Sequence, residues 1–444
     1  MPSQSEFEIA DALFDQLFPL CRSITGPGLR KSLEILRARV PLEVEGVETG
    51  TQVYDWTIPQ EWHIKRAFLK GPDGESYADF DKTNLSVVNY SMPVDRKLPL
   101  QELQQHLHSI AALPTAIPYV TSYYKRNWGF CLPHDVRMKM PEGIYHAFID
   151  SAFVNGELNY GHCVVLGETR GEVLITSYLC HPSLANNELS GPLGLVLLYN
   201  RISKWKRRRF TYRFLVAPET IGSIAYLSRY GDHLKASTVG GLVLTCLGGK
   251  NPSISYKTSR RETSLLDNLV RALKEHEEIV VRIRPFTPQG GSDERQYCSP
   301  GFNLPIGQIA RDVYGEYEGY HNSLDTKAFM NVQSVIQSVD DIEKMLRAFE
   351  YSGVFRNVVP YGEPQLGRRD LYPNINSHNT SSFSSDNMID ERQFLNSVLM
   401  ILNYSDGTAS MLDIAQRCGC AVTRLVPVID RLESEGLLTY ESKV

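Results

Sequence analysis

The stretch from Thr176 to Pro192, TSYLCHPSLANNELSGP, joins two apolar runs through a polar turn. The run before it, 172–179, has the β-branched and aromatic composition of a short buried strand. The run after it, 191–202, has the leucine content typical of a helix. Polar side chains at such a junction lie at the carboxyl edge of a sheet, where open α/β folds bind ligands. Helix capping explains the asparagines and Ser190, but it does not explain His181.

Three further predicted strand ends carry side chains that can bind a metal ion or move a proton. The strand TYRFLVAP ends just before Glu219, and the strand IVVRIRPF leads into a glycine-rich loop with Asp293 and Glu294. His321 lies in a loop before a long final helix. These side chains converge if the strand ends are neighbours, as in an α/β sheet. Two imidazoles with one or two carboxylates match catalytic zinc, which acidifies a bound water for a carboxylate base.

Each of these residues also has an ordinary structural explanation. His181 could be a hydrogen-bonded structural residue, and Glu219 could cap the helix that follows it. Asp293 could be a turn aspartate, and His321 could be a surface histidine. Their order along the chain, each just past a different strand, favours a shared site.

Strand and helix patterns alternate along most of the chain. After the strands within 144–179, the sequence predicts strands in TYRFLVAP, GGLVLTCLG and IVVRIRPF, with helices between them and a long helix at 332–351. Together with a β-hairpin lead-in, this alternation predicts a three-layer α/β/α domain with a mixed sheet. We assign this domain to residues 1–44 and 121–353.

The rest of the chain divides into three parts. Residues 45–120 have short alternating runs broken by Gly and Pro, which predicts a small inserted β-rich domain. Residues 354–387 are rich in Pro, Gly, Asn and Ser and predict a linker. Residues 388–444 show three short helical patterns and a strand, typical of a winged-helix module. Its last helix, 421–435, has two arginines against three acidic residues, which favours protein contact or homo-oligomer formation over DNA binding.

Composition places the chain among ordinary globular proteins. Its 444 residues carry a net charge of −5, which argues against nucleic acid or an acidic membrane as an obligatory partner. No apolar segment is long enough to span a bilayer, and the N-terminus lacks signal-peptide features, so we expect a cytoplasmic protein. The eight cysteines are scattered without a CxxC pair, which predicts reduced thiols rather than disulfides or a cysteine zinc site.

The series of strand-end residues resembles that of zinc aminopeptidases and carboxypeptidases with the bacterial leucyl aminopeptidase fold. The chain has His181, Asn187-Glu-Leu-Ser-Gly191, Glu219 before Gly222-Ser223, Ser292-Asp293 and Tyr320-His-Asn-Ser-Leu-Asp-Thr326. Its whole length more closely resembles a bacterial group labelled aminopeptidase-like and associated by name with polysaccharide biosynthesis, through phrases such as PETIGS and GSDERQYCSPG. The resemblance implies the aminopeptidase-like fold, an inserted β domain, a C-terminal winged helix and a zinc-dependent hydrolase.

Departures from this pattern bear on the number of metal ions. Asn187 stands where the resemblance implies a metal-bridging aspartate, with Glu188 beside it, and Glu219 is a single glutamate where two are implied. A neutral amide oxygen is a poor bridge between two divalent cations. We therefore expect one zinc ion rather than two, held by His181, Glu219 and His321 with Asn187 or Glu188 nearby.

The sequence thus predicts a zinc-dependent aminopeptidase-like hydrolase that cleaves an amide or peptide bond of a small substrate. Glu219 or Asp293 would move the proton. Glu294 would contact the substrate, and Arg368 and Arg369 could hold an anionic group or belong to a solvated linker. The alternative is a non-catalytic metal- or ligand-binding protein that retains the peptidase fold. A DNA-binding regulator would rest on the C-terminal module alone.

Overall fold

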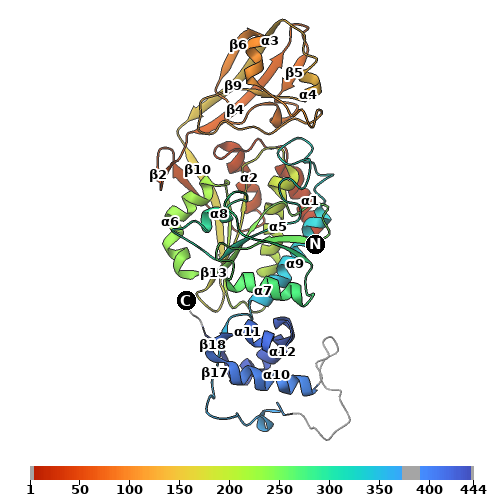
Figure 1. The fold of residues 1–444 in the computed structure, drawn as a ribbon. Coiled ribbons are helices and arrows are strands. Elements are labelled where there is room, and N and C mark those ends of the chain that lie inside the picture. Colours follow the sequence, from red (N-terminus) through yellow and green to blue (C-terminus); the bar gives the residue numbers. More distant parts are fainter. Residues whose placement is uncertain (1–4, 373–390, 442–444) are drawn as a thin grey trace.

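The computed structural model describes residues 5–372 and 391–441, which form three parts arranged in a row (Figure 1). A central α/β domain lies between an inserted β-rich domain at one end and a C-terminal helical module at the other. The eight cysteines are all free thiols, as the sequence predicts. Within the described ranges, no helix has both the length and the apolarity needed to cross a membrane.

The central domain is built on one mixed sheet, which the alternating strand and helix patterns predict. Within the described residues its eight strands have the order β1-β10-β12-β11-β13-β16-β14-β15. The inner strands β12, β11 and β13 are parallel, whereas β10 runs antiparallel to β12. The strands are β1 Glu43–Glu48, β10 Glu157–Val165, β11 Glu172–Tyr178, β12 Thr211–Ala217, β13 Thr238–Leu244, β14 Ile254–Lys257, β15 Val281–Arg284 and β16 Ile306–Ala310.

Helices cover both faces of this sheet and complete the predicted three layers. On one face, a large apolar core forms beneath α1 (Glu6–Leu17), α2 (Pro27–Arg37), α5 (Ser190–Ile202), α7 (Leu265–Glu275) and α9 (Val332–Phe349). On the other face, α6 (Ile221–Ser237) and α8 (Glu294–Tyr297) cover a second core. The inner strands β11 and β12 are buried along their whole length, which is why their sequences read as continuous apolar runs.

The inserted domain has boundaries different from the predicted 45–120. Its sheet, with strand order β5-β4-β9-β6, includes β9 (Ile144–Val154), which pairs with β4 (Glu61–Lys70), while β1 belongs to the central sheet. The cause is the β9–β10 hairpin, whose first strand belongs to one sheet and whose second strand belongs to the other. The remaining elements are β2 Gln52–Val53, β3 Trp56–Thr57, β5 Ser76–Asp79, β6 Val94–Pro99, β7 Leu107–His108, β8 Phe130–Cys131, α3 Leu100–Leu103 and α4 His134–Arg137.

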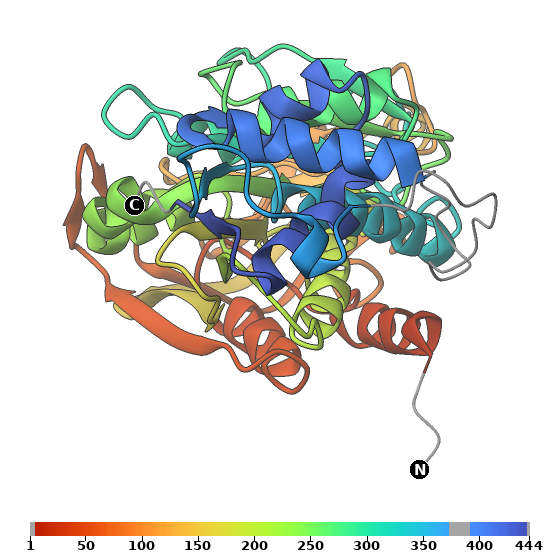
Figure 2. The same ribbon diagram turned by 90° about the horizontal axis from the view of Figure 1, so that it is seen from below.

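The C-terminal module begins earlier than the predicted boundary of 388. Strand β17 (Val354–Asn357) pairs with β18 and β19, so the start of the predicted linker is part of the module's sheet. Residues 373–387 of that linker lie outside the described residues. Seen from below, the helices of the module cover this end of the central domain (Figure 2). Its other elements are α10 Glu391–Tyr404, β18 Asp406–Ser410, α11 Met411–Arg417, α12 Val422–Ser434 and β19 Leu438–Tyr440.

Candidate metal centre

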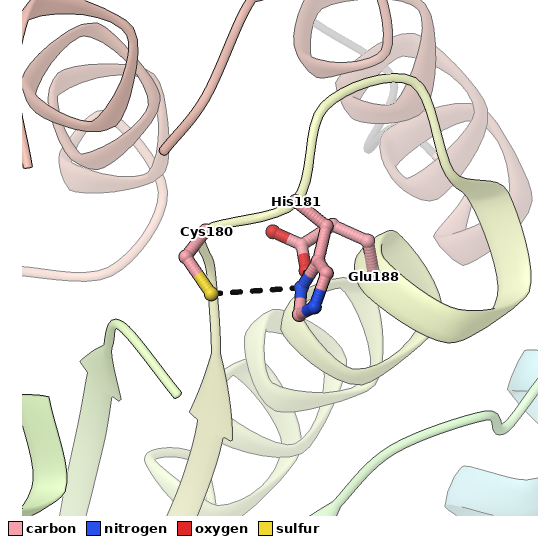
Figure 3. A group of neighbouring side chains, drawn as sticks. All are labelled: Cys180, His181 and Glu188. Carbon is pink, nitrogen blue, oxygen red and sulfur yellow. Dashed lines mark hydrogen bonds and ion pairs between the residues drawn. The ribbon is translucent and has the colours of Figure 1, made fainter. Parts of the chain in front are cut away.

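Cys180, His181 and Glu188 form a buried cluster just past the carboxyl end of β11 (Figure 3). The Nδ1 atom of His181 lies 2.7 Å from Glu188 Oε2 and 3.5 Å from Cys180 Sγ. A carboxylate on Nδ1 orients the ring and leaves Nε2 free for a metal ion. Burial raises the pKa of the Cys180 thiol to about 11, so this cysteine stays a neutral thiol rather than a nucleophile. The ligand atom that this cluster offers is His181 Nε2.

Glu219 approaches that nitrogen from the neighbouring strand. Tyr178 of β11 pairs in register with Ala217 of β12, so the two strands end side by side. Glu219 Oε2 lies 3.8 Å from His181 Nε2, and Glu219 Oε1 accepts a hydrogen bond of 2.7 Å from the Ser292 hydroxyl. Two ligand atoms about 2.1 Å from a tetrahedral zinc ion stand roughly 3.4 Å apart, so a small movement brings both onto one ion.

Asp293 supports the turn that carries Glu219. Thr220 has φ of +64°, a left-handed conformation that β-branched residues rarely adopt, and its N–H donates to Asp293 Oδ1 at 2.7 Å. Asp293 Oδ2 is buried and finds no hydrogen-bond partner in the described part of the chain. Burial and the charge of Glu219 raise the pKa of Asp293 to about 8. The structure therefore brings the two predicted catalytic carboxyls into one site.

His321 lies in the loop before α9 and faces His181. The centroids of the two imidazole rings are 5.3 Å apart, and the rings of Tyr119 and Tyr320 pack against His321. The Tyr119 N–H donates to the His321 carbonyl at 2.8 Å, at a residue whose φ is +56°. Burial and the charge of His181 lower the pKa of His321 to about 3. The His321 imidazole is therefore neutral, which is the form that binds metal.

Asn187 belongs to a single π-helical turn, Ala185–Leu189, between β11 and α5. The Asp325 carboxylate holds this turn by accepting the N–H groups of Asn186 at 2.7 Å and of Asn187 at 2.9 Å. The Asn187 amide donates to the Tyr178 hydroxyl at 2.9 Å, whereas its Oδ1 is buried without a hydrogen-bond partner among the described residues. A buried carbonyl oxygen without a donor is available to a cation.

The structure does not bring the three predicted substrate-binding residues to this site. Glu294 is buried, pairs with Lys257 Nζ at 2.8 Å and accepts the Ser292 N–H at 2.9 Å, so its carboxylate is used inside the fold. Arg368 and Arg369 lie in the C-terminal module, where the Arg369 carbonyl accepts a hydrogen bond from Arg431 of α12. This module is at the opposite end of the central domain from the inserted domain (Figure 1).

Three residues that sequence reasoning missed border on the site. Arg22 donates from Nε to the His181 carbonyl at 3.0 Å, and the Tyr119 ring centroid lies 5.0 Å from that of His181. Asp325 holds the π-helical turn. Arg22 and Tyr119 have no motif or spacing that connects them to His181, whereas Asp325 lies in the same loop sequence as His321, so only Asp325 had a local signal.

The side chains that converge here fit a zinc ion. They are two imidazoles, one of them neutral and the other with a free Nε2, a carboxylate in reach of that nitrogen, and a buried amide oxygen without a donor. Zinc binds nitrogen and oxygen ligands of this kind and leaves a position open at catalytic sites. Fold and site together define an α/β protein with a candidate metal centre at the carboxyl edge of its central sheet.

Comparison with known families identifies the chain further. Residues 11–352 match the family described as a domain of unknown function (DUF4910), and residues 353–440 match a winged helix-turn-helix family. The chain belongs to the DUF4910 family and has a C-terminal winged helix. A Clostridium acetobutylicum protein, provisionally named a polysaccharide biosynthesis protein with aminopeptidase-like domain, is 40% identical over 426 residues, which cover 96% of this chain and 95% of the relative.

Solved structures confirm the predicted fold class. The crystal structure of a Clostridium acetobutylicum protein, provisionally named a peptidase, superposes with a TM-score of 0.84 at 37% identity, covering 98% of this chain and 97% of that one. A zinc aminopeptidase from Bacillus subtilis has a TM-score of 0.56 at 11% identity, covering 78% of this chain and 94% of that one. A peptidase M28 precursor from Shewanella amazonensis has a TM-score of 0.57, also at 11% identity, with coverages of 78% and 93%. At this identity the last two show the fold alone.

Proposed function

We propose that this protein is a zinc-dependent hydrolase that cleaves an amide or peptide bond of a small substrate. The observation that carries the proposal is the approach of His181 Nε2 to Glu219 Oε2, 3.8 Å apart, beside the neutral imidazole of His321. The aminopeptidase-like fold places these side chains at the carboxyl edge of the sheet, where α/β proteins bind ligands. A zinc ion held by the three residues would supply Lewis acidity toward a carbonyl group and a bound water.

The protein's own side chains account for orientation and proton movement. Glu188 fixes the ring of His181, and Ser292 fixes one oxygen of Glu219, so both face the same space. Glu219 is partly exposed, with 26% of its side chain accessible, and is therefore open to solvent and substrate. Asp293, buried behind Glu219, holds the strained Thr220 turn and can keep a proton near neutral pH because burial raises its pKa.

One ion is favoured over two by the ligands next to His181. Asn187 brings an uncharged amide to the position at which a second ion would need a bridging carboxylate. Glu188 has one oxygen on His181, and the other lies 3.4 Å from Arg22 Nε in a buried ion pair. The end of β13 adds no metal ligand either, because Gly248 and Gly249, which follow it, have no side chain.

The second candidate function is a binding protein that keeps the fold without catalysis. The neutral Asn187 and the single glutamate at the end of β12 favour it. Metal content of the purified protein, with activity toward amino-acid amides and N-acyl sugars, separates the two. We expect about one zinc per chain, lost in His181→Ala and His321→Ala but kept in His146→Ala, a histidine of the inserted domain. Zinc binding without turnover of either substrate class would favour the binding protein, and a protein without zinc would refute the hydrolase.

The winged helix supports protein contact rather than DNA binding. Helix α12 packs on the central domain, where Glu433 pairs with Arg207 at 2.6 Å and with Arg209 at 3.2 Å. Asp430 of the same helix accepts a hydrogen bond of 3.0 Å from the Tyr351 hydroxyl. A helix covered in this way cannot enter a DNA groove without first leaving the central domain. A cytoplasmic location and a homo-oligomer formed through this module remain part of the proposal, and gel filtration with light scattering tests the oligomer.

A further inference from the structure

Arg22 is a fully buried arginine that reaches the candidate metal centre from the loop between α1 and α2. Its exposed fraction is 0%. Its Nε donates to the His181 carbonyl at 3.0 Å and lies 3.4 Å from Glu188 Oε1. Its Nη1 donates to the carbonyl of Leu17 at the end of α1, while its Nη2 has no hydrogen-bond partner among the described residues. One guanidinium thus touches the backbone of His181 and the carboxylate that holds its ring.

Stability alone is a poor explanation for this arrangement. Both side chains of the Arg22–Glu188 pair have 0% exposure, and burying two charges costs about as much as their attraction returns unless every donor and acceptor is satisfied. Here Arg22 Nη2 and Glu188 Oε1 have no hydrogen bond in the described structure, so the pair is not fully satisfied. A buried pair of this kind is better explained by its effect on His181, the residue that both side chains contact.

The geometry points to Arg22 and Glu188 as a positioning pair that fixes the orientation and tautomer of His181. Glu188 is held by the cation of Arg22 and accepts the proton on His181 Nδ1, which turns Nε2 toward Glu219. The contact spans 159 positions in sequence and makes the α1–α2 loop part of the site. The expected effect on zinc affinity rests on the proposed function, whereas the expected tautomer of His181 does not depend on it.

The test compares Arg22→Met, Glu188→Gln and the double variant in the full-length protein. The tautomer of His181 is read by ¹⁵N NMR of histidine-labelled protein, with the His181 signal assigned from its loss in His181→Ala. Burial alone would lower the pKa of His181, but the acidic groups around it, Glu188 among them, raise that pKa well above its usual value, so the spectra are recorded at a pH high enough for a neutral ring. In the unchanged protein we then expect the proton on Nδ1. In both single variants we expect a mixture of tautomers, because a glutamine can donate as well as accept and a carboxylate without its cation is no longer held in place.

Zinc affinity, measured by competition with a chromophoric chelator, is the second readout. We expect Arg22→Met and Glu188→Gln each to weaken zinc binding about tenfold or more, as for other residues that orient a metal-binding histidine. The double variant should have a zinc affinity no lower than that of the single variant with the lower affinity, because both residues act through one contact. If Arg22→Met does not fold, Arg22→Lys keeps the charge and should give an intermediate affinity.

Arg213→Met is the matched control. It breaks a buried ion pair with Glu172, in which both side chains are 8% exposed, at a position away from His181. It should lower the unfolding temperature but leave the tautomer and the zinc affinity unchanged. The inference is overturned if His181 keeps a single Nδ1–H tautomer in Arg22→Met and Glu188→Gln, or if Arg22→Met weakens zinc binding no more than Arg213→Met. If the unchanged protein binds no zinc, the proposed function fails and the tautomer comparison still decides the positioning role.

Discussion

Replacement of Asp325 by asparagine should disorder the π-helical turn that carries Asn187. Asp325 is fully buried, and each of its carboxylate oxygens accepts one backbone N–H, from Asn186 at 2.7 Å and from Asn187 at 2.9 Å. Asparagine has nearly the same shape but only one acceptor oxygen. Its NH₂ group would face the second backbone N–H, so one of the two bonds is lost and a buried donor is left unpaired.

The expected cost follows from these two contacts. A hydrogen bond to a charged group contributes about 1.5–3 kcal/mol, and a buried N–H without an acceptor costs about 1–3 kcal/mol. Both figures describe the same lost contact and are not added, so we expect a loss of roughly 2–3 kcal/mol in the free energy of unfolding. Because the turn lies between His181 and α5, we also expect zinc to bind roughly tenfold more weakly, as when other residues that support metal ligands are changed.

Urea unfolding of the zinc-free protein, followed by circular dichroism, measures the first effect, and chelator competition measures the second. Both are run at pH 8, above the pKa of about 7 that burial gives Asp325. Asp312→Asn is the control, because Asp312 Oδ2 accepts two backbone N–H groups, of Lys250 and Asn251, in a loop with no proposed ligand. If Asp325→Asn unfolds and binds zinc as the unchanged protein does, or if Asp312→Asn weakens zinc binding equally, this account of the turn is wrong.

Three further predictions concern acid stability, the winged helix and metal removal. Burial alone would raise the pKa of Glu61, but hydrogen bonds from Arg30 and His63 outweigh burial and lower that pKa to about 2. The stability that the Glu61 carboxylate contributes should be complete above its unfolded pKa, near 4.5, and lost as the pH falls toward 2. Glu61→Gln should therefore flatten this part of the pH–stability curve. Glu433→Gln should destabilise the contact between α12 and the central domain by roughly 3 kcal/mol, because it removes the carboxylate from the nearly buried Arg209, and limited proteolysis should then release the module faster. In zinc at a hundred times its dissociation constant, the free energy of unfolding should be about 2.7 kcal/mol higher than after removal of zinc by a chelator. The His321→Ala variant should show no such difference.

The strand ends were accessible to sequence reasoning because their signals are local. A run such as TYRFLVAP predicts a buried strand by itself, and the polar residue after it must then lie at the sheet edge. This reasoning predicted His181, Glu219 and Asp293 as site residues, and the loop before the long final helix added His321. The short strands β14 and β16, each of four or five residues, carried too little pattern to be recognised. The boundaries of the inserted domain were also missed, because pairing, not composition, assigns β9 to one sheet and β10 to the other.

The sequence by itself determined the fold class, the order of the three parts and the residues at the strand ends, since strand and helix periodicity and turn chemistry act over a few neighbouring positions. Only the tertiary structure decided what each of those residues does. In the folded protein, Glu188 contacts His181 Nδ1, Glu294 is buried in an ion pair with Lys257, and Arg22 donates to the His181 carbonyl. These contacts depend on how distant segments pack, and the 159 positions between Arg22 and His181 leave no periodic trace in the chain.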